Sequence, residues 1–231
     1  MRPVHLIIVD SWHPEALARE WDSLPTLRCM AEFGRLQTDC VSIFPTVTPA
    51  ALTSLATGVG AREHGIQGIL WYSRREDRYI HYWPQPDTLW KGSLRVVARD
   101  VAHLSDQLRA PTLFQLLEEA GIPSASINFP ITAAPFLHRM DLGLLLPLLT
   151  GLPRRLALRG PRWMTYGTLL RPEGFGRWAS KWGITDQIAA AYTRALIQAH
   201  RPPFMLTYFP EHDLRSHHHG PMKVGFSLRK I

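Results

Sequence analysis

Cysteine is scarce in this sequence: only Cys29 and Cys40 occur among 231 residues. Two cysteines cannot form a disulfide framework, and their spacing matches no zinc ribbon. Because Cys40 lies in an apolar stretch, we interpret it as a small buried hydrophobic residue. The sequence also lacks internal repeats and low-complexity tracts.

Long apolar runs are missing as well. No stretch reaches the length that a membrane-spanning helix needs, so we expect no transmembrane segment. The N-terminus runs directly into the apolar residues Val4–Val9, which are too few for the core of a signal peptide. From these features we predict a cytoplasmic protein.

Acidic residues are outnumbered, with 19 Asp and Glu against 26 Lys and Arg, for a formal net charge of +7. A basic balance favours anionic partners, although a basic solvated surface alone also accounts for it. The arginines are scattered, so we expect no specific binding of nucleic acid. With 45% hydrophobic and 19% charged residues, the chain is typical of a globular protein with a real core, and nothing in it indicates an oligomeric state.

Apolar segments alternate with amphipathic ones along the chain. The predicted strands are Val4–Val9, Leu36–Val41, Ser124–Asn128 and Phe204–Phe209. The predicted helices are Pro25–Phe33, Pro49–Ala56, Pro111–Ala120 and Ile184–Ala199. This alternation predicts an α/β fold with a mostly parallel central sheet flanked by helices. The first strand is a continuous β-branched run and is expected to be buried on both faces.

We predict one domain over residues 1–231, with insertions near 71–110 and 140–180 that form the rim of a binding site. In parallel sheets, ligands bind at the carboxyl ends of the strands. Asp10, the loop Thr46–Thr48, Asn128 and Asp213 all follow predicted strands, so we expect them to meet at one edge of the sheet.

Thr48 and Pro49 form a helix-start signal, with threonine as N-cap and proline at the first helical position. A hydroxyl at this position lies beside unpaired N–H groups and the positive end of the helix dipole, which attract an anion and stabilise an alkoxide. An ordinary N-cap role remains an alternative for Thr48, and Asp10 in the same way could merely cap the helix after it.

A metal site is indicated by the segment 211–219, where one Glu, one Asp and four His follow a predicted strand. Carboxylates and imidazoles together suit Zn²⁺, Mn²⁺ or a similar ion. The histidine run is internal and three residues long, unlike an expression tag.

Five landmarks follow one another along the chain. They are an apolar strand that ends in Asp10, Pro45-Thr46-Val47-Thr48, Thr57-Gly58, His64-Gly65-Ile66, and Asp213 with His217 and Gly220-Pro221. Their order and spacing resemble those of the type I phosphodiesterase and nucleotide pyrophosphatase group of the alkaline phosphatase superfamily. The resemblance runs from Val4 to Gly220.

The resemblance implies an alkaline-phosphatase-like fold and a metal-dependent hydrolase of phosphodiester or pyrophosphate bonds. Thr48 would be the nucleophile, and two divalent ions, usually zinc with manganese or magnesium as alternatives, would flank it. One ion would bind Asp10 and Thr48, and the other Asp213 and His217. The expected substrate is a small phosphate ester such as a nucleotide or an aryl phosphodiester.

Two positions near the nucleophile depart from the family pattern. Ala51 stands where an asparagine normally donates to the phosphate, so Thr46, Asn128 or N–H groups at the helix start would have to replace it. Ser11 stands where glycine is common.

The family also completes its metal sites with an Asp-His-Gly motif and a later histidine, and nothing in this chain matches them. We therefore expect a copy that is truncated, with a fold that is incomplete at its C-terminal end. Two alternatives stay open: a phosphomonoesterase or phosphonate hydrolase of the same superfamily, and a catalytically inactive protein that binds metal or phosphate.

Overall fold

The computed structural model describes residues 2–82, 107–127, 129, 131, 137–141, 155–159 and 184–220. Asn128 and most of the two expected insertions lie outside this set. Within it, no helix is long and apolar enough to cross a membrane.

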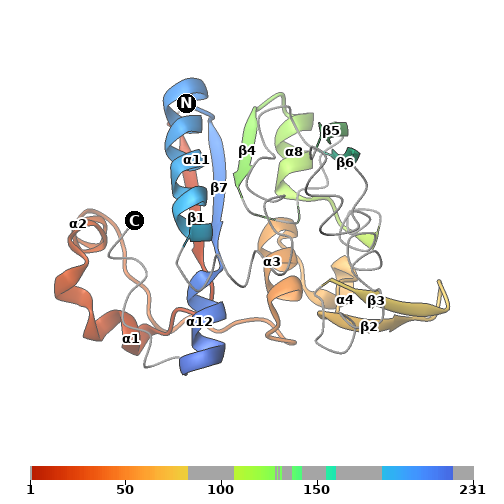
Figure 1. The fold of residues 1–231 in the computed structure, drawn as a ribbon, viewed down its shortest axis with the longest axis horizontal. Coiled ribbons are helices and arrows are strands. Elements are labelled where there is room, and N and C mark those ends of the chain that lie inside the picture. Colours follow the sequence, from red (N-terminus) through yellow and green to blue (C-terminus); the bar gives the residue numbers. More distant parts are fainter. Residues whose placement is uncertain are drawn as a thin grey trace.

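A parallel three-stranded sheet forms the centre of the described structure (Figure 1). Its order is β1 (Val4–Val9), β7 (Phe204–Phe209) and β4 (Ser124–Ile127), so strands from the two ends of the chain are neighbours. β7 pairs with β1 from Val4↔Phe204 to Val9↔Phe209 and is buried along its whole length. The parallel sheet confirms the predicted fold class.

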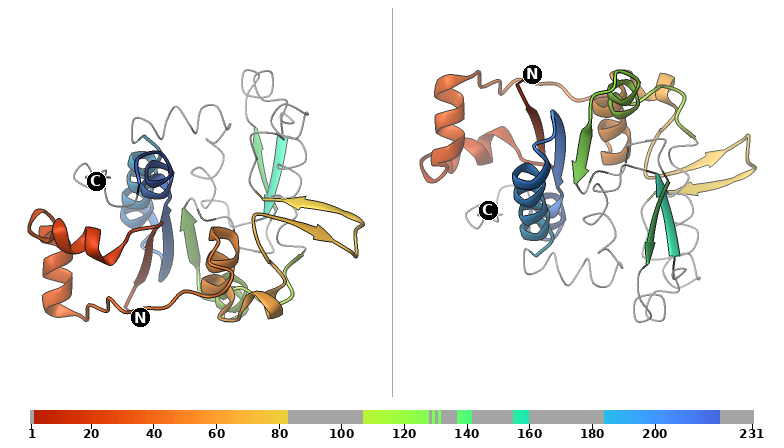
Figure 2. Two further views of the ribbon diagram at one scale, coloured as in Figure 1. Left: turned by 90° about the horizontal axis from the view of Figure 1, so that it is seen from below. Right: turned by 90° about the horizontal axis from the view of Figure 1, so that it is seen from above.

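Helices cover both faces of the sheet, as Figure 2 shows. On one face, α11 (Ile184–His200) packs against Met205 and Phe209 of β7. On the other face, α3 (Thr48–Thr57) and α8 (Leu113–Glu119) pack against alternate β7 residues. Because successive side chains of β7 point to opposite faces of the sheet, this strand contributes to two hydrophobic cores, one beneath each helical layer.

Local sequence signals account for several helix ends. α2 spans the predicted Pro25–Phe33, with proline in its first turn. α8 begins after Thr112, which forms a capping box with Gln115. α3 ends at Gly58, whose φ of 74° is the left-handed conformation that glycine adopts at little cost.

The remaining helices are short and follow β1 or flank the site. α1 (Pro14–Arg19), the 3-10 helix η1 (Trp21–Ser23) and α2 form an arm that projects from the sheet on the side away from β4 (Figure 1). α4 (Ala61–His64) follows α3, and α12 (Glu211–His219) continues directly from β7.

β1 is an edge strand in the described sheet, so the expectation that it would be buried on both faces was wrong. Val4 and Ile7 are exposed to 57% and 49%. Only Leu6, Ile8 and Val9 pack against the two cores. The apolar run predicted the strand correctly, but its burial depends on a neighbour on the outer side, and no described element pairs there.

The predicted strand Leu36–Val41 does not form either. This segment has no regular secondary structure and pairs with no strand in the described part of the chain, and Val41 is 96% exposed. Cys40 is likewise exposed, in contrast to its predicted burial. Strand propensity acts through cross-strand packing and burial, and without a partner the same residues stay in an irregular loop.

Two antiparallel pairs lie within or beside the expected insertions. β2 (Leu70–Ser73) pairs with β3 (Arg78–His81), and β5 (Leu137–Asp141) pairs with β6 (Arg155–Arg159). The inner face of the β2–β3 hairpin buries Ile80 and packs Trp71 against the core. These parts of the insertions are regular strands, and their role at the rim of a site stays a prediction.

Candidate active site

The candidate site lies where β1 and β7 end together. The N–H of Asp10 donates to the carbonyl oxygen of Phe209 at 3.0 Å, which continues the strand pairing by one residue. After Phe209 the chain passes through Pro210 and enters α12, which carries Asp213. Parallel pairing in this register therefore brings Asp10 and the acidic start of α12 to the same edge of the sheet.

The hydroxyl of Thr48 faces Asp10. Its Oγ1 donates to Asp10 Oδ2 at 3.4 Å, a long hydrogen bond between residues 38 apart in sequence. α3 begins one residue earlier than predicted, so Val47 is the N-cap and no side chain caps the helix. Thr48 is thus the first helical residue, and its hydroxyl lies toward a carboxylate across the site.

Free N–H groups at the start of α3 are few. Pro49 has none, and the N–H of Ala51 already donates to the carbonyl of Val47 at 3.0 Å. In the described part of the chain, the N–H groups of Thr48 and Ala50 remain without a backbone acceptor. The anion-attracting end of this helix therefore offers at most two backbone donors.

Asp213 and His217 are one helical turn apart on α12. His217 Nε2 lies 3.4 Å from Asp213 Oδ1, and the His217 side chain is 75% exposed. The histidine-rich segment is a helix, and i, i+4 spacing places these two side chains on one face. They are brought together as expected, although the sequence pattern did not predict the helix.

Ser11 joins the two halves of the site. Its hydroxyl donates to Asp213 Oδ1 at 2.6 Å, and its backbone N–H donates to the carboxylate of Asp10. Ser11 has a φ of 57°, in the left-handed region. That conformation also explains why glycine is common at this position in the family that the sequence resembles.

Burial raises the pKa of Asp10 above its ordinary value, and the negative charge of Asp213 raises it further. Hydrogen bonds from Tyr208, Thr48 and the Ser11 backbone act in the opposite direction. Two carboxylates held this close in a half-buried site repel each other, and a bound cation would relieve that repulsion.

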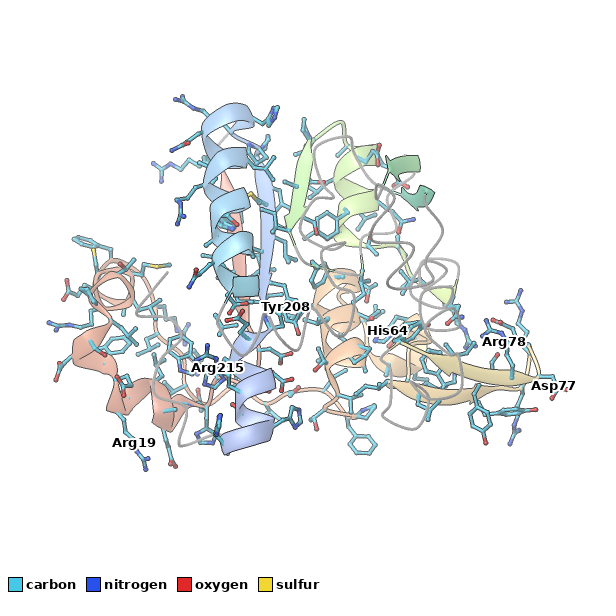
Figure 3. All side chains as sticks on the ribbon, in the orientation of Figure 1. Arg19, His64, Asp77, Arg78, Tyr208 and Arg215 are labelled. Carbon is cyan, nitrogen blue, oxygen red and sulfur yellow. The ribbon has the colours of Figure 1, made fainter. Side chains whose placement is uncertain are left out.

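The sequence interpretation missed two residues of this site, Tyr208 and His212. Tyr208 lies near the end of β7 (Figure 3). Its hydroxyl donates to Asp10 Oδ2 at 2.5 Å. His212 is only 3% exposed, and its Nε2 has no hydrogen-bond partner within the described residues. Strand alternation toward the α3 face was the available signal for Tyr208. Nothing in the sequence distinguished His212 from the other histidines of segment 211–219.

Burial lowers the pKa of His212, although a hydrogen bond with the backbone of Asp10 and the negative charges of Asp213 and Asp10 act in the opposite direction. His212 is therefore a buried imidazole that lies beside both carboxylates of the candidate site.

The donors occur in two pairs that suit metal binding. Thr48 Oγ1 and Asp10 Oδ2 are 3.4 Å apart, as are His217 Nε2 and Asp213 Oδ1. Two ligands of one tetrahedral zinc ion, each about 2.0 Å from it, are roughly 3.3 Å apart. Among the described residues no group of three or more His, Cys, Asp or Glu is close enough to hold a metal ion, so each pair is an incomplete ligand set.

Thr46 is exposed in the loop before α3, two residues from Thr48. Its side chain makes no hydrogen bond to the other site residues in the described structure. Asn128, the second expected substrate contact, lies outside the described residues. The structure thus places Thr48 beside Asp10 and His217 beside Asp213, and the catalytic, metal-binding and substrate-binding roles of all six predicted residues stay predictions.

The His64-Gly65-Ile66 landmark has a structural role. His64 is fully buried, and its Nδ1 accepts the N–H of Ile66 at 3.1 Å. Nε2 therefore carries the hydrogen and lies 3.0 Å from the hydroxyl of Ser54 on α3. Because His64 donates to Ser54, this pair fixes α3 against α4 and does not activate a nucleophile.

Comparison with known proteins identifies the family of the chain. The family model described as type I phosphodiesterase / nucleotide pyrophosphatase matches residues 4–227. No curated protein matches the sequence at a significant level.

Several solved structures share the fold. Phosphonoacetate hydrolase from Sinorhizobium meliloti 1021, in complex with phosphonoacetate, aligns with a TM-score of 0.55, 16% identity, 91% of this chain and 46% of that chain. Murine ectonucleotide pyrophosphatase / phosphodiesterase 5 aligns with a TM-score of 0.56, 15% identity, 95% of this chain and 46% of that chain. An inactive variant of the murine protein in complex with AMP aligns with a TM-score of 0.55 and 15% identity, over 99% of this chain and 48% of that chain. The chain therefore spans about half the length of these relatives.

Proposed function

Because the chain belongs to the type I phosphodiesterase / nucleotide pyrophosphatase family, we propose that it hydrolyses phosphodiester or pyrophosphate bonds with Thr48 as the nucleophile. The observation that carries this proposal is the hydrogen bond from Thr48 Oγ1 to Asp10 Oδ2 at 3.4 Å. A threonine that only capped α3 would direct its oxygen to the helix N–H groups, and this one lies toward a carboxylate instead.

Asp10 is placed to orient the nucleophile. It accepts hydrogen bonds from Tyr208, Thr48 and the Ser11 backbone, so its position is fixed from three sides. Attack on phosphorus requires loss of the Thr48 proton, and the nearest acceptor is Asp10 Oδ2. The raised pKa of Asp10 makes this carboxylate a better proton acceptor than an ordinary aspartate.

Asp10 with Thr48, and Asp213 with His217, would hold two divalent ions. Zinc fits this oxygen and imidazole set, and manganese or magnesium is an alternative. Bound there, such ions stabilise the charge on the attacking and leaving oxygens of the transferring phosphoryl group. The two ligand pairs supply part of each coordination shell, and the remaining ligands have to come from other groups.

Phosphate oxygens would be held at the start of α3. Ala51 cannot donate from its side chain, so the N–H groups of Thr48 and Ala50, with Thr46 and Asn128, are the proposed donors. The substrate is proposed to be a small phosphate ester such as a nucleotide. The murine structure in complex with AMP supports this class of ligand.

A phosphonate is the second candidate substrate. The observation in its favour is the similarity to phosphonoacetate hydrolase, whose fold aligns over 91% of this chain. The same nucleophile and the same metal pair would serve either reaction, so the assay has to separate them.

The test starts from the purified full chain loaded with zinc. Bound metal is measured by elemental analysis, and turnover is compared on an aryl phosphodiester, an aryl phosphomonoester and phosphonoacetate. Thr48→Val removes the hydroxyl but keeps the shape, and we expect turnover to fall about a thousandfold or more. Thr48→Ser keeps a nucleophilic hydroxyl and should retain measurable activity.

Turnover that survives in Thr48→Val would exclude Thr48 as the nucleophile. Release of phosphate from phosphonoacetate without hydrolysis of the diester would favour the second candidate. A wild-type chain that binds zinc but hydrolyses none of the three substrates would favour the inactive metal-binding alternative.

A further inference from the structure

Ser11 adopts a backbone conformation that its side chain does not favour. Its φ of 57° lies in the left-handed region, which among the described non-glycine residues only Asp77 and Arg201 share. Glycine would adopt this conformation without steric conflict. A serine here needs a compensating interaction, and the structure provides one.

Both hydrogen-bond donors of Ser11 are used on carboxylates. The hydroxyl donates to Asp213 Oδ1 at 2.6 Å, between residues 202 apart in sequence. The backbone N–H donates to the carboxylate of Asp10. One residue therefore connects the acidic group at the end of β1 to the acidic group on α12.

These two aspartates repel each other, because each is an acceptor and each carries negative charge when ionised. A hydrogen-bond donor placed between them offsets this repulsion. The short Ser11 bond is charge-assisted and so among the stronger hydrogen bonds of a protein. It engages Oδ1, the oxygen that also lies 3.4 Å from His217, while Oδ2 makes no hydrogen bond in the described structure.

We propose that Ser11 is a positioning residue that holds the carboxylates of Asp10 and Asp213 together and sets the orientation of Asp213 for a divalent cation. This inference rests on the proposed function for one point, which is that the two carboxylates bind a divalent cation. Glycine at this position would supply the N–H to Asp10 but nothing to Asp213. The serine thus links the two proposed pairs of metal-binding residues, Asp10 with Thr48 and Asp213 with His217.

A purely conformational role for residue 11 makes the opposite prediction. If the position needs only a left-handed turn, Ser11→Gly should be neutral or better in every respect. If the hydroxyl matters, Ser11→Gly should weaken the metal site even where it leaves the fold intact or more stable. The two substitutions Ser11→Gly and Ser11→Ala therefore separate the roles, because only alanine keeps the backbone strain.

The experiment titrates Zn²⁺ into the full chain by isothermal titration calorimetry and records thermal unfolding of each variant. We expect Ser11→Gly and Ser11→Ala both to raise the zinc Kd roughly tenfold, the usual effect of losing an outer-shell hydrogen bond to a ligand. Arg201→Gly is the matched control, since it relieves the same kind of backbone conformation at the opposite end of β7 and should leave the zinc Kd unchanged. A Ser11→Gly variant that binds zinc as tightly as the wild type overturns the proposal.

A double-mutant cycle decides the inference if the wild-type chain binds no zinc, a result that would count against the proposed function. Urea unfolding is measured for the wild type, Ser11→Gly, Asp213→Ala and the double variant. A Ser11–Asp213 coupling of roughly tenfold in the unfolding constant supports the link between the carboxylates. Strictly additive effects overturn it.

Discussion

At the scale of single residues, the candidate site contains side chains that are unfavourable for stability in the absence of a ligand. Asp10 is the main example, since it is half-buried, close to a second carboxylate and without a basic partner among the described residues. Such a group stabilises a bound cation and destabilises the metal-free protein. The same trade-off is common at functional sites.

Asp10→Asn should therefore stabilise the metal-free chain at neutral pH. Because the folded-state pKa of Asp10 is raised above its value in the unfolded chain, its ionisation disfavours the folded state as pH rises through 3.8 and the higher folded value. Asparagine keeps an acceptor for Tyr208 and removes the charge, so we expect a gain of roughly 1 kcal/mol in urea unfolding at pH 7.

The same variant should lose the thermal stabilisation that zinc gives the wild type. Tyr208→Phe is its control, because it removes a hydrogen bond to Asp10 but no charge. An Asp10→Asn protein that is less stable than the wild type at pH 7 would show that the carboxylate is not repelled in the folded state.

At the scale of secondary-structure elements, the site depends on how α3 is held. Its N-terminal threonine is positioned by burial of Leu52 and Ala56 in the core and by the Ser54–His64 contact with α4. Burial lowers the pKa of His64, although a hydrogen bond with the backbone of Ala50 and the charge of Glu63 act in the opposite direction. The Nδ1 of the neutral ring accepts the N–H of Ile66.

His64→Asn should remove one source of acid sensitivity. A lowered folded-state pKa means that the stability due to neutral His64 is complete above the unfolded value of 6.5 and is lost as pH falls below it. Asparagine can accept the Ile66 N–H without titrating. We expect it to destabilise the fold by about 1 to 3 kcal/mol at pH 8, because Ser54 loses its partner.

The measurement compares urea unfolding of the wild type and of His64→Asn between pH 8 and pH 5. The difference between them should shrink as pH falls, by at most about 1.4 kcal/mol per pH unit for one proton. His5 and His212 also have lowered pKa values and remain in both proteins, so the difference isolates His64. Parallel curves would contradict the assignment.

At the scale of the whole molecule, the described structure exposes large apolar residues in the arm and in the segment that follows it. The arm and the segment after it expose Phe33 to 88%, Val41 to 96% and Phe44 to 93%. Globular proteins rarely leave several large apolar side chains exposed in one region unless another surface covers them.

We expect the purified chain to bind the dye ANS and to elute from size exclusion with a concentration-dependent apparent mass. Phe33→Ser with Phe44→Ser should lower ANS fluorescence markedly while changing the free energy of unfolding by no more than about 0.5 kcal/mol, since these side chains bury little surface. Leu55→Ser, a half-exposed residue on α3, serves as the control and should leave ANS fluorescence unchanged.

Patterns local in sequence were sufficient for much of the structure. The apolar run before Asp10, the helix α2 between Pro25 and Phe33, and the strand Phe204–Phe209 were all predicted correctly, because proline, glycine and side-chain periodicity act over a few residues. A prediction that depended on a partner strand was wrong: Leu36–Val41 has strand composition and pairs with no strand among the described residues.

The candidate site divides in the same way. The sequence by itself determined the family, the candidate nucleophile Thr48 and the candidate ligands Asp10, Asp213 and His217, because their order and spacing are written along the chain. Only the tertiary structure decided that Thr48 faces Asp10 and that Ser11 reaches Asp213. Those contacts join residues 38 and 202 positions apart, and they depend on β1 pairing in parallel with β7, which local propensity does not specify.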